Sequence, residues 1–362
     1  MGKKKIMTVR GPIEPAALGL TSMHDHIMFN GSVLGKRLRG DLPEHNLPIH
    51  EDDKVSLENV GILQRNTILA WDALNQDDEA MLTAEVADFK AAGGEAILEL
   101  SVPGILLDTE ANRRISAATD VHIIISTGFY TEDSWPEQYR GLSTKEYREH
   151  MLFEVEHGVN GTDIKPGHLK IGLLNLSADE EKTLRAAAQV ANETGLSLTV
   201  HPCRKPGGDF QRIISILKEE GMNLERLVMA HTPLLDAPPM AEVIRQPERY
   251  RVNTDRAKYL LDTGCTISTE FLNPMCLELL GEYNAGDWAK MSGLISLINQ
   301  GYCQQIVTGN DCCGKIMLKR CGGEGFCRML YFTIPTLREV AGVSEYALKH
   351  ITVENPRRIL AY

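Results

Sequence analysis

Short apolar runs alternate with longer amphipathic stretches along most of this 362-residue chain. Eight of the runs are nearly continuous in apolar character, and several are rich in β-branched residues, which is typical of strands covered on both faces. The stretches 80–92, 179–194 and 210–220 have helical spacing and each ends next to a glycine. The expected strands are Leu18–Met23, Ala96–Ser101, Val121–Thr127, His168–Leu173, Leu196–His201, Arg226–His231, Cys265–Glu270 and Gln305–Asn310.

Strands that alternate with helices over this length favour an α/β fold, the (β/α)8 TIM barrel. An open doubly wound sheet is the alternative, but the Gly-rich phosphate loop that usually follows its first strand is missing. Residues 27–78 are too long and too polar for a simple strand-to-helix loop, so we expect an excursion over the mouth of the barrel. Because the sequence shows no linker or repeat, residues 1–362 are expected to form a single domain.

Charge and composition narrow the classes of function. The formal charge of -11 argues against a nucleic-acid-binding surface. No apolar signal segment follows the basic N-terminus and no apolar run could span a bilayer, so we expect a cytoplasmic protein without membrane contacts. The eight cysteines are therefore expected to be mostly free thiols, and the four within 312–327 lack the Cys-x-x-Cys spacing of a structural zinc site.

A pair of histidines at the end of the first expected strand is the clearest chemical signal. His24 and His26 stand at positions i and i+2, which places both imidazoles on one face of a strand. Neutral imidazole is a common ligand for zinc and other divalent metals. The two histidines could equally pack or cap the strand end, and the pair alone does not decide between these interpretations.

Other metal-ligand residue types stand at the ends of later strands. His201 ends the fifth strand, His231 ends the sixth, Asp311 follows the eighth, and Lys170 lies within the fourth. In a (β/α)8 barrel these strand ends meet on the catalytic face. Each residue has an ordinary explanation by itself, such as a helix N-cap for Asp311 or a surface ion pair for Lys170. A shared metal site explains all of them together.

The same segments resemble the phosphotriesterase family of the amidohydrolase superfamily, which includes lactonases and related amidases. The resemblance covers nearly the whole chain. It rests on Gly19-Leu-Thr-Ser-Met-His-Asp-His26, on Lys165-Pro-Gly-His-Leu-Lys170, on Asn310-Asp311 with Lys315 and Gly322-Gly323 after it, and on Val353-Glu-Asn-Pro-Arg-Arg-Ile-Leu360.

The resemblance implies a centre of two divalent metal ions. His24, His26 and Asp311 would hold the more buried ion, and His201 and His231 the more exposed one. Zinc is the first candidate metal, with manganese, cobalt and iron as alternatives.

Lys170 and Asp311 are the residues to which the resemblance assigns catalytic roles. Lys170, carboxylated by carbon dioxide, would bridge the two ions together with a hydroxide that attacks the substrate. An ammonium has no acceptor for a metal, so Lys170 must first lose its proton. Asp311 would ligate and also accept the proton, then pass it to the leaving group.

Five further residues are candidates for roles around this centre. Tyr130 resembles a tyrosine that lines the substrate site in lactonase members, although it could be a packing aromatic. Glu99 and Ser101 could orient the ligand histidines or merely fill polar space. Organophosphate hydrolases place a histidine after the seventh strand, where this chain has Ser268-Thr-Glu-Phe-Leu272. Glu270 is not taken to replace that histidine, but it is a candidate for substrate binding. Arg204 could attract an anionic substrate or belong to a solvated basic loop.

We therefore expect a hydrolase of a small carboxylic ester, lactone or amide whose substrate could be anionic. Organophosphate triester hydrolysis is the alternative activity, and a non-catalytic ligand-binding barrel is the alternative of another class. His231-Thr-Pro-Leu234 replaces the Gly-Asp-Thr stretch that family lactonases often carry after this histidine, so the usual substrates are in doubt. The family resemblance also implies a homodimer.

Overall fold

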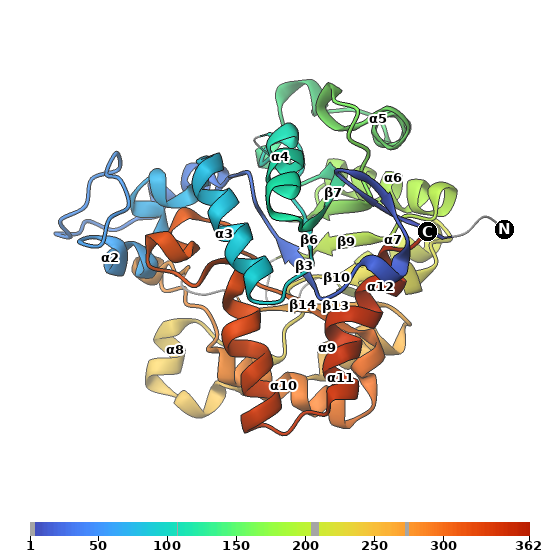
Figure 1. The fold of residues 1–362 in the computed structure, drawn as a ribbon. Coiled ribbons are helices and arrows are strands. Elements are labelled where there is room, and N and C mark those ends of the chain that lie inside the picture. Colours follow the sequence, from blue (N-terminus) through green and yellow to red (C-terminus); the bar gives the residue numbers. More distant parts are fainter. Residues whose placement is uncertain (1–3, 107, 204–209, 272–274) are drawn as a thin grey trace.

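Eight parallel strands form the centre of the computed structural model, which describes residues 4–106, 108–203, 210–271 and 275–362. They neighbour one another in chain order and helices surround them (Figure 1), which confirms the predicted (β/α)8 barrel. The eight strands are β3 (Thr21–Asp25), β6 (Ala96–Glu99), β7 (His122–Phe129), β8 (His168–Gly172), β9 (Leu198–His201), β10 (Leu227–Met229), β13 (Thr266–Glu270) and β14 (Ile306–Gly309).

Helices connect the strands on the outside of the barrel, and the three helices expected from the sequence lie within one residue of α3, α6 and α7 at each end. Shorter 3-10 turns and π-helical segments fill out the remaining connections. The α-helices are α1 (Ser32–Leu38), α2 (Val60–Arg65), α3 (Glu79–Ala91), α4 (Thr109–Thr119), α5 (Thr144–His157), α6 (Ala178–Thr194), α7 (Phe210–Glu219), α8 (Met240–Arg245), α9 (Asp255–Asp262), α10 (Asp287–Asn299), α11 (Glu345–Lys349) and α12 (Asn355–Leu360).

Helix α6 shows how local sequence sets these boundaries. The Ser177 hydroxyl accepts a hydrogen bond from the Glu180 amide, and the Glu180 carboxylate accepts one from the Ser177 amide in return. Gly195 ends the helix in the left-handed conformation, with φ at 77°. Between these caps, Leu184 and Ala187 are buried in the cluster that also contains strand residues of β8 and β9.

The segment after β3 forms the predicted excursion. It includes a two-stranded antiparallel ribbon of β4 (Phe29–Asn30) and β5 (Asn75–Gln76), with helices α1 and α2 between the strands. Figure 1 shows this excursion at the opposite end of the barrel from the chain termini. Two other ribbons were not expected from the sequence, namely β1 (Ile6–Thr8) with β2 (Gly11–Ile13), and β11 (Leu235–Asp236) with β12 (Arg251–Val252).

The last strand meets the first at one close contact. The Asp311 amide donates a hydrogen bond of 2.8 Å to the His24 carbonyl. A Cβ at Gly309 would lie 2.5 Å from the His24 nitrogen, closer than any side-chain carbon approaches a backbone atom. Gly309 therefore allows β14 to lie directly against β3, and this contact brings the ends of the first and last strands together.

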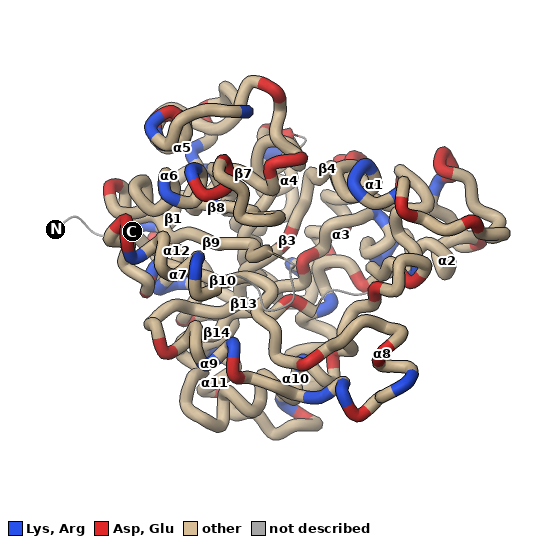
Figure 2. The backbone as a smooth tube through the Cα atoms, turned by 180° about the vertical axis from the view of Figure 1, so that it is seen from behind, with Lys and Arg blue, Asp and Glu red and all other residues tan. Residues whose placement is uncertain are grey.

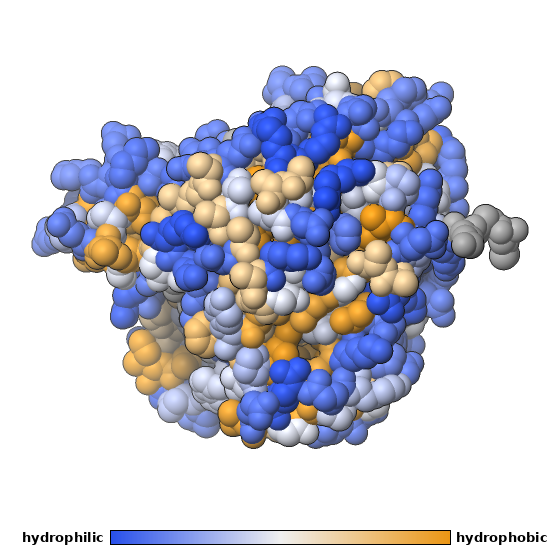
Figure 3. Space-filling view, viewed as in Figure 1, coloured by the Kyte–Doolittle hydropathy of each residue, from blue (hydrophilic) through white to orange (hydrophobic). Residues whose placement is uncertain are grey.

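The outer surface is mixed in character. Charged residues gather on the outer helices and loops, whereas the central strands carry few of them (Figure 2). Hydrophilic residues cover most of the face in Figure 3, with smaller hydrophobic areas between them. Among the described residues, no helix combines the length and apolar character needed to cross a membrane, and no disulfide joins any of the eight cysteines.

Substituting Gly309 tests the closure of the barrel. Gly309→Ala should lower the melting temperature because the new methyl group overlaps the His24 backbone, an overpacking that costs roughly 1–3 kcal/mol. Gly61→Ala is the matched control, because open space surrounds Gly61 in α2 and alanine favours helix. Equal melting temperatures for the two variants would contradict this account of the closure.

Candidate metal centre

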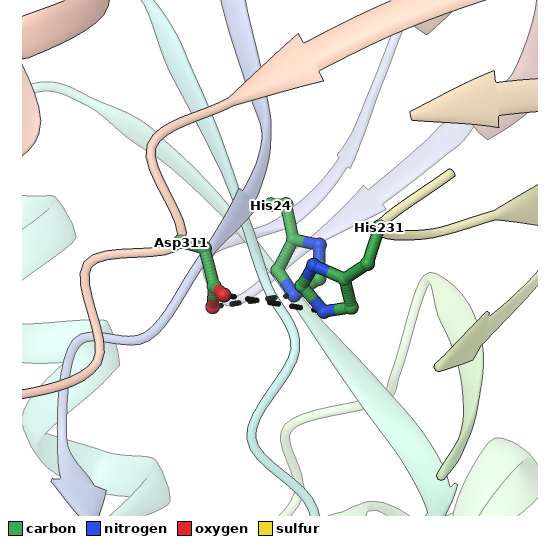
Figure 4. Close-up of side chains that lie close together, drawn as sticks. All are labelled: His24, His231 and Asp311. Carbon is green, nitrogen blue, oxygen red and sulfur yellow. Dashed lines mark ion pairs between the residues drawn. The ribbon is translucent and has the colours of Figure 1, made fainter. Parts of the chain in front are cut away.

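A cavity opens at the carboxyl ends of the central strands. The structure brings all six residues with predicted metal-binding roles to this cavity, namely His24, His26, Lys170, His201, His231 and Asp311. Figure 4 shows that three of them, from β3, from the segment after β10 and from the segment after β14, point toward one another. Their candidate ligand atoms all lie within 4.8 Å of one another, a spacing that one metal ion could serve.

The Asp311 carboxylate lies at the centre of this group. One of its oxygens is 3.5 Å from Nε2 of His24 and 3.3 Å from Nε2 of His26, and the other is 3.9 Å from Nε2 of His231. The ring of His201 lies 4.6 Å from that of His231, centroid to centroid. Three imidazoles thus present the same ring nitrogen to one carboxylate, and a fourth lies beside them.

Two of these residues have unusual backbone conformations. His231 has φ at 50° and Asp311 has φ at 51°, although neither is a glycine. Left-handed backbone at a non-glycine residue persists only where the surrounding structure enforces it, and it is concentrated at functional sites. Both residues follow the ends of their strands and line the cavity. Strand periodicity could not predict their left-handed backbone conformation.

The Glu270 carboxylate contacts Nδ1 of two of the histidines. Its carboxylate oxygens lie 3.0 Å from Nδ1 of His24 and 2.9 Å from Nδ1 of His231, and one of them accepts the His231 amide at 2.9 Å. Burial would raise the pKa of Glu270, but the interactions with His231 and His24 hold it well below its ordinary value. An ionised carboxylate at Nδ1 leaves Nε2 of each ring free to bind a metal. Glu270 does not line the cavity among its described residues, so its position differs from that of the substrate-binding residue we expected.

Ser101 and Glu99 lie behind the remaining first-strand histidine. The Ser101 hydroxyl is 2.9 Å from Nδ1 of His26, and the Glu99 carboxylate is 3.9 Å from the same atom. Glu99 also accepts hydrogen bonds from the amides of Ile27 and Ser101. Burial raises the pKa of Glu99 against these hydrogen bonds. Both side chains thus lie next to Nδ1 of His26, the placement that their proposed role in orienting this histidine requires.

Asp25, between the two histidines, was not singled out in the sequence. Its side chain accepts hydrogen bonds from the Asn310 side chain at 3.0 Å and from the Cys312 amide at 2.9 Å. Burial raises the pKa of Asp25 to about 7. Strand alternation was the available signal, because it sends the middle residue of His-Asp-His away from its neighbours. Asp25 thereby ties β3 to both flanks of Asp311.

Lys170 carries a buried amine in the lining of the cavity. It is fully buried, and Nζ makes no hydrogen bond to any described residue. Burial lowers the pKa of Lys170 to about 8, although Asp311 and Glu270 oppose that shift. The neutral amine needed for reaction with carbon dioxide is therefore accessible near neutral pH. An orphaned lysine among imidazoles and a carboxylate fits a carbamate ligand better than a free ammonium, because an ammonium offers no acceptor.

Burial favours the neutral form of the His24 imidazole. Burial lowers its pKa to about 4, and the positive charge of Lys170 acts in the same direction. The imidazole is then uncharged at neutral pH, as metal binding requires. The donor set of imidazoles and one carboxylate fits divalent cations such as zinc, manganese or cobalt.

The cavity wall is largely apolar. It includes Phe29, Val33, Leu34, Ile105 and Met275. Such a wall with a few polar groups is typical of a small-molecule site.

Four further residues were either expected near this site or missed by the sequence analysis. Tyr130 lines it, with its ring 5.3 Å from that of His201, centroid to centroid. Arg204 lies outside the described residues. Arg37 of α1 lines the cavity but was missed, because the excursion carries no motif that marks it. Lys290 of α10 was also missed, and its amine donates to the Glu270 carbonyl at 2.8 Å.

Comparisons with known proteins agree with this site. The model of the phosphotriesterase family matches residues 4–360. A phosphotriesterase-related protein of Nematostella vectensis is 30% identical over 363 residues, which cover 98% of each chain. The N-acetyltaurine hydrolase of Xenopus tropicalis is 29% identical over 364 residues, covering 99% of this chain and 98% of its own.

A solved structure extends the similarity to the whole fold. The resiniferatoxin-binding protein of Rhodobacter sphaeroides superposes with a TM-score of 0.83 at 28% identity, covering 98% of this chain and 94% of the other. The matched residues include β3 with its histidine pair and the segment of Asp311. The chain therefore belongs to the phosphotriesterase family.

Proposed function

We propose that this protein is a metal-dependent hydrolase that cleaves a small amide. Membership of the phosphotriesterase family and relatives that are named as hydrolases support the hydrolase class. The observation that carries metal dependence is the convergence of His24, His231 and Asp311 within 4.8 Å around an apolar cavity. A barrel that only binds ligands would have no use for four imidazoles gathered beside a buried lysine whose amine makes no hydrogen bond to a described residue.

Six residues would hold two cations. His24, His26 and Asp311 would hold one, His201 and His231 the other, and carboxylated Lys170 would bridge them. Divalent cations held by these residues would supply Lewis-acid chemistry, which activates a water and polarises the carbonyl oxygen of the substrate. Glu270 and Ser101 keep the imidazoles in one tautomer and one orientation, so that little reorganisation is needed during the reaction.

Asp311 would move the proton. Its carboxylate lies at the cavity surface, and the interactions with His24, His26 and His231 lower its pKa despite burial. The ionised carboxylate can accept the proton from the attacking water. It can then deliver that proton to the amide nitrogen, which must be protonated to leave.

The relatives favour an amide as the substrate. Several of them are named N-acetyltaurine hydrolase, and they align with 98–99% of this chain. N-acetyltaurine joins an acetyl group through an amide to an ethanesulfonate. Because the chain is 26–29% identical to these relatives, the amide class is a better first choice than lactones or phosphotriesters. A panel of N-acyl amides, lactones, esters and organophosphates tests this ranking directly.

Metal removal provides the broadest test. Dialysis against a chelator should abolish amide hydrolysis, and zinc, manganese or cobalt should restore it, because the water is activated only between the cations. The restored protein should contain about two metals per chain by elemental analysis. Full activity after removal of all metal would contradict the proposal.

Lys170→Met should reduce the metal content. Methionine fills a similar volume but cannot form a carbamate, so about one metal or fewer per chain should remain in elemental analysis. Activity should fall by roughly 100-fold or more. Lys315→Met is the matched control, because Lys315 is also a largely buried lysine but pairs with Asp72 and Asp77 and is not among the described residues that line the cavity. Two metals in Lys170→Met would show that no carbamate bridge is needed.

Glu270→Gln should weaken metal binding without removing a ligand. One amide oxygen can still accept from one imidazole, but the amide nitrogen cannot accept from the other, so one ring loses its orientation. Affinity for zinc, measured by competition with a chromogenic chelator, should fall by about 10- to 100-fold. Glu85→Gln is the control, because Glu85 is equally buried and accepts the amides of Lys319 and Arg320 away from the cavity. An equal loss in both variants would count against the role of Glu270.

A further inference from the structure

One positively charged side chain projects into the cavity from the excursion. Apart from the histidines, Arg37 and Lys170 are the cationic residues among the described ones that line it. Lys170 is fully buried at the strand ends, whereas the Arg37 side chain is 21% exposed. Arg37 is therefore the cation that an incoming small molecule would meet on the described wall.

The guanidinium of Arg37 is fixed along one edge. Its Nε donates to one oxygen of Asp133 at 2.7 Å, and its Nη2 donates to the other at 2.8 Å. The second hydrogen of Nη2 reaches the Thr131 hydroxyl at 3.0 Å. The Nη1 group makes no hydrogen bond to any described residue, so two of the five guanidinium donors are left for a ligand.

Thr131, which accepts a hydrogen bond from Arg37, lies next to a residue that contacts the candidate metal centre. Thr131 directly follows Tyr130, and the ring of Tyr130 packs 5.3 Å from that of His201. Consecutive Cα atoms are about 3.8 Å apart. A group bound at Arg37 and a carbonyl at His201 could thus belong to one small molecule.

The lining of the cavity defines the chemistry of that molecule. Apolar side chains of Val33, Leu34 and Ile105 line the same space as Arg37. An apolar wall with one oriented cation suits a short alkyl chain that ends in an anion. Planar guanidinium groups favour oxyanions such as sulfonate and carboxylate, to which they donate charge-assisted hydrogen bonds.

We propose that Arg37, held by Asp133 and Thr131, recognises the anionic end of the substrate, a sulfonate or carboxylate joined to the amide by a short chain. The inference deepens the proposed function and rests on it for the identity of the reacting bond. It adds a residue of the excursion to the anion recognition expected of Arg204, which lies outside the described residues.

A salt bridge with only a structural role is the competing explanation. It would tie α1 to the segment after β7 and would not depend on the substrate. Arg39 provides the matched control, because it pairs with Glu51 at 2.8 Å and lies over the ring of Trp71, also within the excursion. Arg39 is not among the described residues that line the cavity.

The kinetic test compares three acetamides of similar size. They are N-acetyltaurine with a sulfonate, N-acetyl-β-alanine with a carboxylate, and the neutral N-propylacetamide. In Arg37→Gln, the ratio of kcat/KM for an anionic amide to that for the neutral amide should fall by about 10- to 100-fold relative to the unaltered protein. Arg39→Gln should keep the original ratio. An unchanged ratio in Arg37→Gln, or an equal fall in both variants, would overturn the inference. The anionic amide whose kcat/KM ratio falls more identifies the oxyanion that Arg37 prefers.

A binding test separates this inference from the proposed function. Propane-1-sulfonate is titrated by calorimetry into the full chain and both variants, without and with added zinc. The affinity should fall by about 10-fold or more in Arg37→Gln and stay constant in Arg39→Gln. If that pattern appears while no amide is hydrolysed, the proposed function fails and the anion site stands. If propane-1-sulfonate does not bind, or binds both variants equally, the anion site is wrong even if amides are cleaved.

Discussion

The contact between the last strand and the first is the constraint on which the site depends. A hydrogen bond from the Asp311 amide to the His24 carbonyl, at 2.8 Å, joins the two strand ends. Gly309 removes the side chain that would hold them apart, and Asp25 secures the same junction through Asn310 and the Cys312 amide. Because of this closure, residues separated by nearly the whole chain present their side chains to one cavity.

Closure of the barrel also shifts the pKa values of the residues that it buries. Closing the barrel buries imidazoles, an amine and a carboxylate together, and burial lowers the pKa of both His24 and Lys170. Those shifts favour the uncharged forms that can bind a metal or react with carbon dioxide. Glu270 offsets part of the cost by holding His24 and His231 through their other ring nitrogens. A site of this kind is costly without cations, because it leaves the Lys170 amine without a hydrogen bond to any described residue.

The sequence predicts the regular parts of this arrangement and misses the irregular ones. The eight strands follow from continuous apolar runs, and the barrel follows from their alternation with helices. The convergence of His24, His201 and His231 follows because parallel strands in a barrel end at one face. The position of Glu270 behind two histidines depends on which side of β13 faces the centre, and one-residue register is the weakest part of a sequence-based prediction. The position of Arg37 in the cavity wall was not predicted, because only tertiary packing brings the excursion over the cavity.

The most direct measurement is a crystal structure of the zinc-loaded protein with data collected at the zinc absorption edge. If the proposed two-metal centre is right, two anomalous peaks should appear, one beside His24, His26 and Asp311 and the other beside His201 and His231. Continuous density should also run from Nζ of Lys170 to both peaks. A single peak, or two peaks with an unmodified Lys170 side chain, would contradict the proposed bridged centre.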